Sequence, residues 1–127
     1  MLYEIESTKT IDQVCQDLEK AVVEYKFGVM TVHNLKETMK NKGVDFEKEC
    51  RIFEVCNPNQ AKRVLEKNME ISTALPCRIS VFTEGGKVKL ATLKPTALIS
   101  QFHIPELEPV AKEVEGTLIQ IMKKAST

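Results

Sequence analysis

The stretch RIFEVCNPNQAKRVLEKN, residues Arg51–Asn68, decides the fold. Its first part, Arg51–Cys56, is dense in apolar and β-branched residues, and this predicts a buried strand. Asn57 then supplies an N-cap, and Pro58 has the fixed φ that suits a first helical turn. The segment therefore predicts a strand that runs straight into a helix, with the Cys56 thiol at the junction.

The predicted helix has recognisable start and stop signals. Gln60 is expected to complete a capping box with Asn57, and Asn68 is expected to end the helix in the left-handed conformation. One face of the helix is apolar, with Ala61, Val64 and Leu65. This amphipathic pattern predicts that the helix packs against the rest of the domain.

The composition predicts one globular domain over residues 1–127. Hydrophobic residues make up 43% and charged residues 28%, which is the balance of a folded soluble protein. Eighteen basic residues are matched by eighteen acidic ones, so the broad positive field that attracts nucleic acid is missing. We expect no nucleic-acid partner.

The sequence also indicates a compartment. No apolar run approaches the ~20 residues of a membrane span, and the N-terminal MLYEIESTKT has no signal core. We expect a cytoplasmic protein without membrane partners. In that setting the four cysteines are expected to be reduced thiols: Cys15, Cys50, Cys56 and Cys77.

The periodicity along the chain predicts an α+β fold. Five strands are predicted, at Leu2–Glu6, Phe27–Val32, Arg51–Cys56, Arg78–Thr83 and Val88–Leu93. Helices are predicted to begin after the N-caps Thr10, Asn34 and Asn57, and at Pro95 and Pro105. The order βαβαβαββα predicts a single-domain two-layer sandwich, a mixed and mostly antiparallel sheet with helices packed on one face.

Glycine and lysine mark details of the sheet. Gly85 and Gly86 supply the positive φ of a tight hairpin between the last two strands. Gly28, inside the second strand, indicates a bulge or a close backbone approach. Lys87 and Lys89 flank a strand that we expect at an edge, where lysine opposes aggregation.

Short motifs in a fixed order resemble a known family. They are Phe27-Gly-Val, Gly43-Val-Asp-Phe46, Arg51-Ile, Cys56-Asn-Pro58 with Ala61 behind it, and Leu75-Pro-Cys77. From about Ile5 to about Ile121 the chain resembles the family catalogued as domain of unknown function 302. The resemblance implies a small α+β domain that forms dimers, and it carries no agreed reaction. Family members often occur beside or fused to sulfur-handling and redox modules, which makes Cys56 and Cys77 relevant.

The candidate site consists of Cys56, Asn57, Pro58, Pro76 and Cys77. Both cysteines sit at strand ends that adjoin turns, where pockets open in α+β domains. If the two strands are antiparallel neighbours, the thiols approach each other; if they are parallel, the thiols lie at opposite ends. The sequence leaves this choice open.

Two interpretations of Cys56 compete. A helix N-terminus stabilises negative charge, which favours a thiolate that acts as a nucleophile or metal ligand. The commoner role is a small buried core thiol. Glu54 lies two residues earlier and is expected to raise the pKa of the thiol by like-charge repulsion.

The leading functional hypothesis is a dimeric small-ligand-binding or accessory module rather than a self-contained enzyme. The sequence has no CxxC, HExxH, GxGxxG or GxxxxGK[ST] motif, and His33 and His103 stand in no paired-ligand spacing. No metal-ligand set or cofactor is assigned. The alternative is thiol-based sulfur or redox chemistry, or thiolate ligation of a metal or haem, through Cys56 with Cys77. A small molecule or a sulfur carrier is the expected partner.

A homodimer is expected because the helices suffice for only one face of a five-stranded sheet. The uncovered face is predicted to carry Cys50, Ile52, Glu54 and Cys56.

Overall fold

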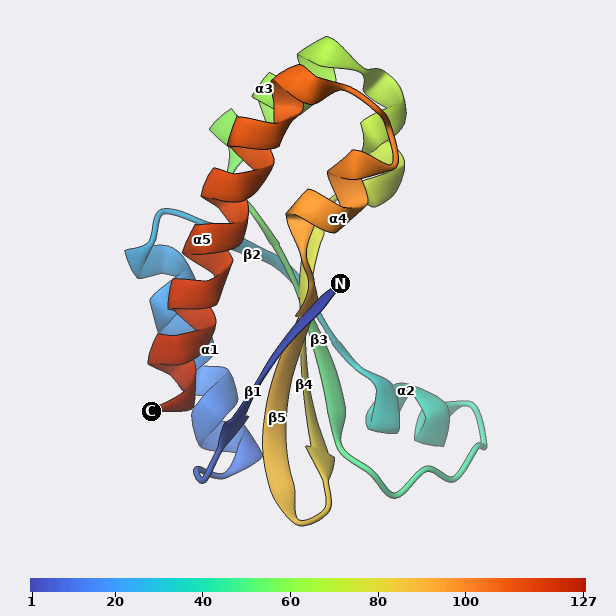
Figure 1. Ribbon diagram of the computed structural model, residues 1–127. Coiled ribbons are helices and arrows are strands. Elements are labelled where there is room, and N and C mark those ends of the chain that lie inside the picture. Colours follow the sequence, from blue (N-terminus) through green and yellow to red (C-terminus); the bar gives the residue numbers. More distant parts are fainter.

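A five-stranded sheet runs through the centre of the computed structural model, which describes residues 1–127 (Figure 1). Its strands are β1 (Leu2–Ser7), β2 (Gly28–Asn34), β3 (Cys50–Cys56), β4 (Cys77–Glu84) and β5 (Lys87–Leu93). Their order across the sheet is β1-β5-β4-β3-β2, and every neighbouring pair is antiparallel. The predicted α+β class is confirmed.

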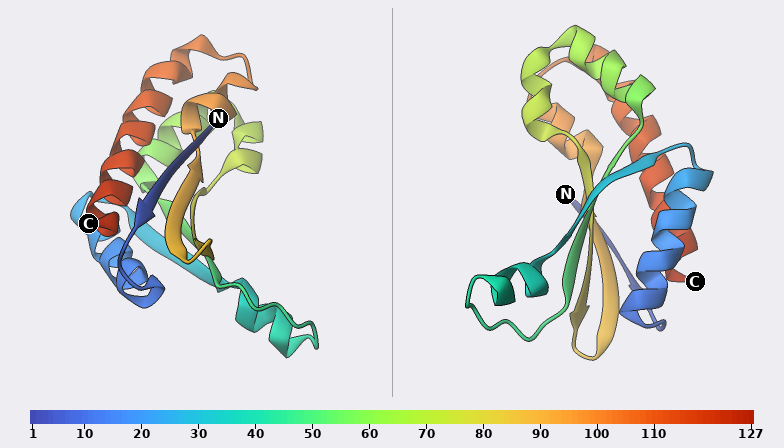
Figure 2. Two further views of the ribbon diagram at one scale, coloured as in Figure 1. Left: turned by 60° about the horizontal axis from the view of Figure 1, so that its bottom comes forward. Right: turned by 180° about the vertical axis from the view of Figure 1, so that it is seen from behind.

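Helices lie beside the sheet and beyond one of its ends. They are α1 (Ile11–Glu24), α2 (Leu35–Asn41), α3 (Pro58–Lys67), α4 (Pro95–Ser100) and α5 (Glu108–Ser126), with 3-10 turns η1 (Met69–Ala74) and η2 (Pro105–Leu107). The helices α1 and α5 lie side by side against one face, whereas α2 projects from the other side (Figure 2). The elements α3, η1 and α4 gather with the start of α5 past the strand ends (Figure 1). None of the helices combines the length and apolarity needed to cross a membrane.

The main core lies between the sheet and the pair α1 and α5. Alternate strand residues point to one face, so the inward positions of the central strands are apolar. Its fully buried members include Phe53, Val55, Ile79, Val81, Leu90, Leu18, Leu118 and Ile121. A smaller cluster under α3 contains Val64, Ile71, Ile99, Leu107, Val110 and Ala111. Val114 of α5 packs against both clusters, so α5 ties the two parts of the domain together.

Local signals set the helix starts and the hairpin as predicted. The side chains of Thr10, Asn34 and Asn57 each accept a hydrogen bond from the backbone amide three residues on. Gly85 and Gly86 have φ of 60° and 77°, which is the left-handed region that a tight hairpin needs.

Two predicted helix signals are wrong in detail. Asn68 has φ of −161°, which is extended, and its side chain accepts a hydrogen bond from the Glu70 amide, so it begins η1 instead of ending α3 in a left-handed turn. The Gln60 side chain does not close a capping box. It donates to Glu113 on α5 at 2.9 Å, because that acceptor lies within reach once α5 packs beside α3.

Two predicted features of the sheet also differ. The register of β2 shifts between Val29 and Thr31, so the bulge lies after Gly28. The strand β5 is interior, between β1 and β4, and Lys89 pairs there with Glu84 at 2.9 Å and Glu4 at 3.5 Å. Lys89 therefore joins neighbouring strands through ion pairs, and it does not protect an edge.

The face of the sheet opposite α1 and α5 is the open face. We define it by the outward positions of β3 and β4, which include Cys50, Ile52, Glu54, Ser80 and Phe82. Ile52 and Phe82 stay half-buried there. Cys56 was predicted on this face and has the same strand parity, and as the last residue of β3 it also borders two hollows beside α3.

Candidate functional site

The candidate site lies where β3 ends and β4 begins. These strands are antiparallel neighbours, and Val55, the residue before Cys56, is the register partner of Cys77. The intervening chain leaves through α3 and returns through η1 (Figure 1). The structure thus resolves the choice that the sequence left open: the two cysteines lie at the same end of the sheet.

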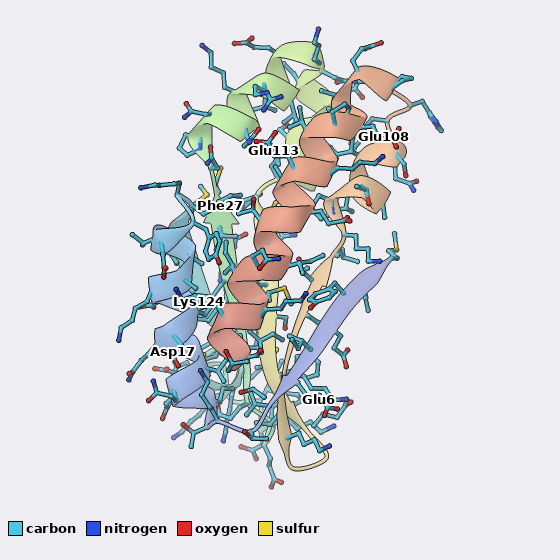
Figure 3. All side chains as sticks on the ribbon, turned by 60° about the vertical axis from the view of Figure 1, so that its left-hand side comes forward. Glu6, Asp17, Phe27, Glu108, Glu113 and Lys124 are labelled. Carbon is cyan, nitrogen blue, oxygen red and sulfur yellow. The ribbon has the colours of Figure 1, made fainter.

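A small inner cavity lies beneath α3, with a volume of about 50 Å³. Thirteen of its sixteen lining residues are hydrophobic, and they come from the strand ends, α3, α4 and α5. Figure 3 shows Phe27, one of these residues, where α1 meets the end of the sheet. A group inside this cavity would be surrounded almost entirely by apolar side chains.

The polar side chains that border the inner cavity are already engaged. Asn57 accepts from the Gln60 amide at 3.2 Å and donates to the Lys26 carbonyl at 3.1 Å. Gln60 donates to Glu113 and accepts from Arg63 at 2.8 Å; Figure 3 shows Glu113 on α5 beside α3. These amides hold the helix ends in place, so they offer no free partner to a polar ligand.

An outer groove lies on the other side of the cavity wall, between the start of β2 and α3. Its volume is about 680 Å³. Its apolar lining includes Val29, Met30, Pro58, Leu65 and Met69, and its rim carries the ion pair of Lys62 and Glu66. Cys56 and Ala61 border both hollows, so they form the wall between the inner cavity and the outer groove.

The structure brings most of the predicted site residues together. Cys56, Asn57 and Cys77 line the inner cavity, Pro58 lines the outer groove, and Pro76 borders neither hollow. Sequence reasoning did not assign the other walls of the cavity to the site, which include Phe27, Ala61, Val64, Leu98, Val110 and Val114. The available signal was the apolar stripe of each helix, which indicates burial but does not distinguish a cavity wall from the core.

Burial decides the protonation state of the two thiols. It raises the pKa of Cys56 above its ordinary value. Burial and, second, the nearby Cys56 raise the pKa of Cys77 to about 11. Removal from water disfavours the charged thiolate and opposes the stabilisation expected from the start of α3. Both shifts in pKa favour the protonated thiols at neutral pH.

Glu54 does not act on Cys56 either. Its carboxylate lies 3.1 Å from His33 Nε2 and accepts from Arg78 Nε at 3.3 Å on the open face. The hydrogen bonds and charges of His33 and then Arg78 lower the pKa of Glu54. Burial is the only cause that shifts the pKa of Cys56, and the carboxylate of Glu54 is held by His33 and Arg78.

The remaining cysteines lie elsewhere. Cys15 is buried in the main core, and the Cys50 sulfur lies 3.9 Å from the Ser80 hydroxyl on the open face. All four cysteines are free thiols. No group of three or more His, Cys, Asp or Glu side chains is arranged to hold a metal ion.

Comparisons with known proteins agree with this fold. Among curated proteins none matches the chain. The family model described as domain of unknown function DUF302 matches residues 3–125. A crystal structure of an uncharacterized conserved protein DUF302 from Bacillus stearothermophilus shares 31% sequence identity, with a TM-score of 0.93 over 98% of this chain and 97% of that chain. The chain therefore belongs to the DUF302 family.

Proposed function

We propose that this chain is a binding or accessory module that holds a small apolar molecule at the junction of β3, β4 and α3. The observation that supports it is an apolar inner cavity that meets an outer groove at Cys56 and Ala61. Ligand pockets typically measure about 300–1,000 Å³. The outer groove has this size, so the ligand lies in the groove and inserts an apolar end toward the cavity.

The chemistry of the walls supports binding in preference to catalysis. Both thiols are protonated at neutral pH, and the bordering amides of Asn57 and Gln60 are engaged. General acid–base catalysis needs a free titratable group within hydrogen-bond reach of the reacting atoms, and the titratable groups of the outer groove, Lys62 and Glu66, are paired with each other. Apolar surface and shape remain as the means of recognition.

Replacing Ala61 with phenylalanine is expected to lower the affinity for linear alcohols at least tenfold. The ring would occupy the wall shared by the cavity and the groove, and it would displace the ligand by direct overlap. Ligand-observed NMR with alcohols of increasing chain length measures the affinity.

Asn59→Phe is the matched control, because Asn59 is exposed on the same helix and borders neither hollow. It should bind the alcohols as the unchanged chain does. Equal loss in both variants, or no binding by the unchanged chain, would contradict the proposed function.

The second candidate function is thiol chemistry through Cys56 with Cys77. One observation favours it: both thiols border a single cavity. Their raised pKa values oppose a role as nucleophiles in sulfur transfer or redox exchange, since the thiolate is the reactive form. Ligation of a metal or of haem iron is less affected, because a bound metal displaces the thiol proton. We propose the cytoplasm as the compartment, because it keeps thiols reduced.

We further propose a homodimer that buries the open face. Ile52 and Phe82 are half-buried there, and Leu2 and Leu93 at its margin are 59% and 44% exposed. The charges on this face are already paired, as in the cluster of Glu54 with His33 and Arg78. Two copies related by a two-fold axis would therefore meet without unpaired like charges.

Light scattering is expected to give twice the 14.4 kDa of one chain, and Ile52→Glu is expected to give a monomer. A carboxylate at the centre of the interface would be desolvated without a partner, which destabilises the dimer. Met69→Glu is the control, because Met69 is exposed at the outer groove, away from the open face. A monomeric mass for the unchanged chain would refute the dimer.

A further inference from the structure

The strand β2 forms one edge of the sheet and has no neighbour on its outer side. It is the last strand in the order β1-β5-β4-β3-β2, and it pairs only with β3. Met30, Thr31, Val32 and His33 are all exposed, and no turn or loop makes a backbone hydrogen bond to them. Figure 2 shows β2 in cyan, with no helix across it in the view from behind. Alternate residues of such an edge point N–H and C=O groups away from the sheet, so β2 presents backbone donors and acceptors without partners.

The two edges of the sheet differ in their protection against pairing. Edge strands of folded proteins usually carry features that prevent pairing with another chain, such as charged side chains or proline. The strand β1, at the other edge, carries Glu4 and Glu6. The sequence of β2, GVMTVHN, contains no Lys, Arg, Asp, Glu or Pro. Its one protective feature is the bulge between Val29 and Thr31, and the register is regular again over Thr31–Asn34. Of the two edges, β2 is therefore the one open to a further strand.

The outer groove begins at the first residues of this same strand. Gly28, Val29 and Met30 line it on one side, and residues of α3 and η1 line it on the other. Met30 of β2 and Met69 of η1 are 62% and 69% exposed. Methionine side chains adapt to apolar groups of different shapes and are over-used at binding surfaces that accept many partners. A chain extended along the free side of β2 would continue into the groove and place an apolar side chain there.

We propose that β2 and the outer groove bind an extended, uncharged peptide segment of another protein, which adds a strand to the sheet. Alternating N–H and C=O groups are matched by another polypeptide backbone, whereas a lipid or an alcohol supplies no such row. The charged side chains of the groove, Lys62 and Glu66, pair with each other at 3.5 Å, so a charged segment would find no partner. This inference rests on the proposed function, because an apolar side chain of the peptide takes the place of the small apolar molecule.

A second copy of this chain fits the edge less well. Two copies of β2 related by a two-fold axis would pair antiparallel, with Asn34 of one copy near Gly28 of the other. The helix α2 begins at Leu35, directly after β2. Such pairing would bring a helix to the groove instead of an extended chain, and the groove would not receive a strand.

Selection of a random heptapeptide library, displayed on phage, against the unchanged chain tests the proposal. We expect enrichment of uncharged sequences that are rich in β-branched residues and have one larger apolar residue near an end. With the best peptide bound, alternate amides of Thr31–Asn34 should exchange their hydrogens about tenfold more slowly or less, as an added backbone hydrogen bond requires. No enrichment, enrichment of charged sequences, or the same protection at high protein concentration without peptide would overturn the proposal.

Backbone methylation of the selected peptide separates strand pairing from side-chain contact. Two versions carry N-methyl groups at alternate positions, one on the odd and one on the even residues, and keep every side chain. Only one set of amides faces β2, so one version should bind at least about tenfold more weakly than the other, through the loss of its hydrogen bonds. Equal affinities would show that the peptide does not pair with the edge.

A variant of the edge distinguishes this inference from the proposed function. Val32→Lys should weaken peptide binding about tenfold, because lysine on an edge strand opposes pairing, and it should leave alcohol binding unchanged, since Val32 borders neither hollow. Val44→Lys is the matched control, because Val44 is an exposed valine in the loop after α2. If alcohols bind and no peptide does, this inference is wrong and the proposed function stands. If neither binds, both are wrong.

Discussion

Replacing Phe53 with alanine is expected to lower the free energy of unfolding by about 3–5 kcal/mol. Phe53 is only 1% exposed, and it packs on β3 against the layer of α1 and α5. Removing the ring loses its transfer free energy and leaves a cavity that the rigid sheet cannot close. Because domains of this kind are stable by about 5–15 kcal/mol, the variant would be near the limit of folding. Denaturant unfolding followed by circular dichroism measures the loss.

Phe82→Ala is the matched control, because Phe82 is a phenylalanine on the neighbouring strand that faces the other way. In the monomer, Phe82→Ala should lower the free energy of unfolding by about 1 kcal/mol, because much of the ring is already in contact with water. A larger loss at high protein concentration, where the dimer forms, would fit burial of the open face. If the two alanine variants lost equal stability in dilute solution, the assignment of the core to one face would be wrong.

Local chemistry made most of the elements predictable. A cap such as Asn57 acts on an amide three residues away, and the Gly85-Gly86 turn needs only its own φ angles. The strand order is different, because β1 pairs with β5 through partners such as Leu2 and Leu93 that lie far apart in the sequence. Alternation in a strand shows that it has two faces, but it does not name the neighbour. That is why β5 was expected at an edge.

The candidate site was predictable in its residues and not in its environment. Cys56, Asn57 and Cys77 follow from strand ends and a cap, which are local features. Whether the thiols meet depends on the antiparallel pairing of β3 and β4. The expected effect of Glu54 on Cys56 used neighbours in sequence and missed partners across the sheet, because His33 of β2 and Arg78 of β4 hold the Glu54 carboxylate.

Alkylation of Cys77 by iodoacetamide is expected to be about a hundredfold slower at neutral pH than that of an ordinary thiol. Its pKa is raised from 9.0 to about 11, which lowers the thiolate fraction by about two powers of ten. Cys56 should react sooner than Cys77. Burial alone raises the pKa of Cys56, whereas burial and the neighbouring Cys56 both raise the pKa of Cys77. Mass spectrometry of the labelled peptides over about pH 7 to 10 measures both rates.

The same shift gives the stability a definite pH dependence. The folded pKa of Cys77 lies above the unfolded value, so the folded state keeps the proton longer as the pH rises. The contribution of this thiol to stability is therefore complete below about pH 9 and is lost as the pH rises toward 11. A Cys77→Ala variant lacks this titration. The difference in unfolding free energy between the two proteins should shrink across that pH range.

Labelling of the unfolded chain is the control for the alkylation rates, because in denaturant all four cysteines lie in water and should react at similar rates. If labelling stayed slow in denaturant, the local sequence around the cysteine would be the cause of the slow rate, and the folded environment would not.

One further result would change the functional conclusion. A fast reaction of Cys56 at neutral pH would mean that the start of α3 outweighs burial after all, and sulfur transfer through a Cys56 thiolate would then become the leading function.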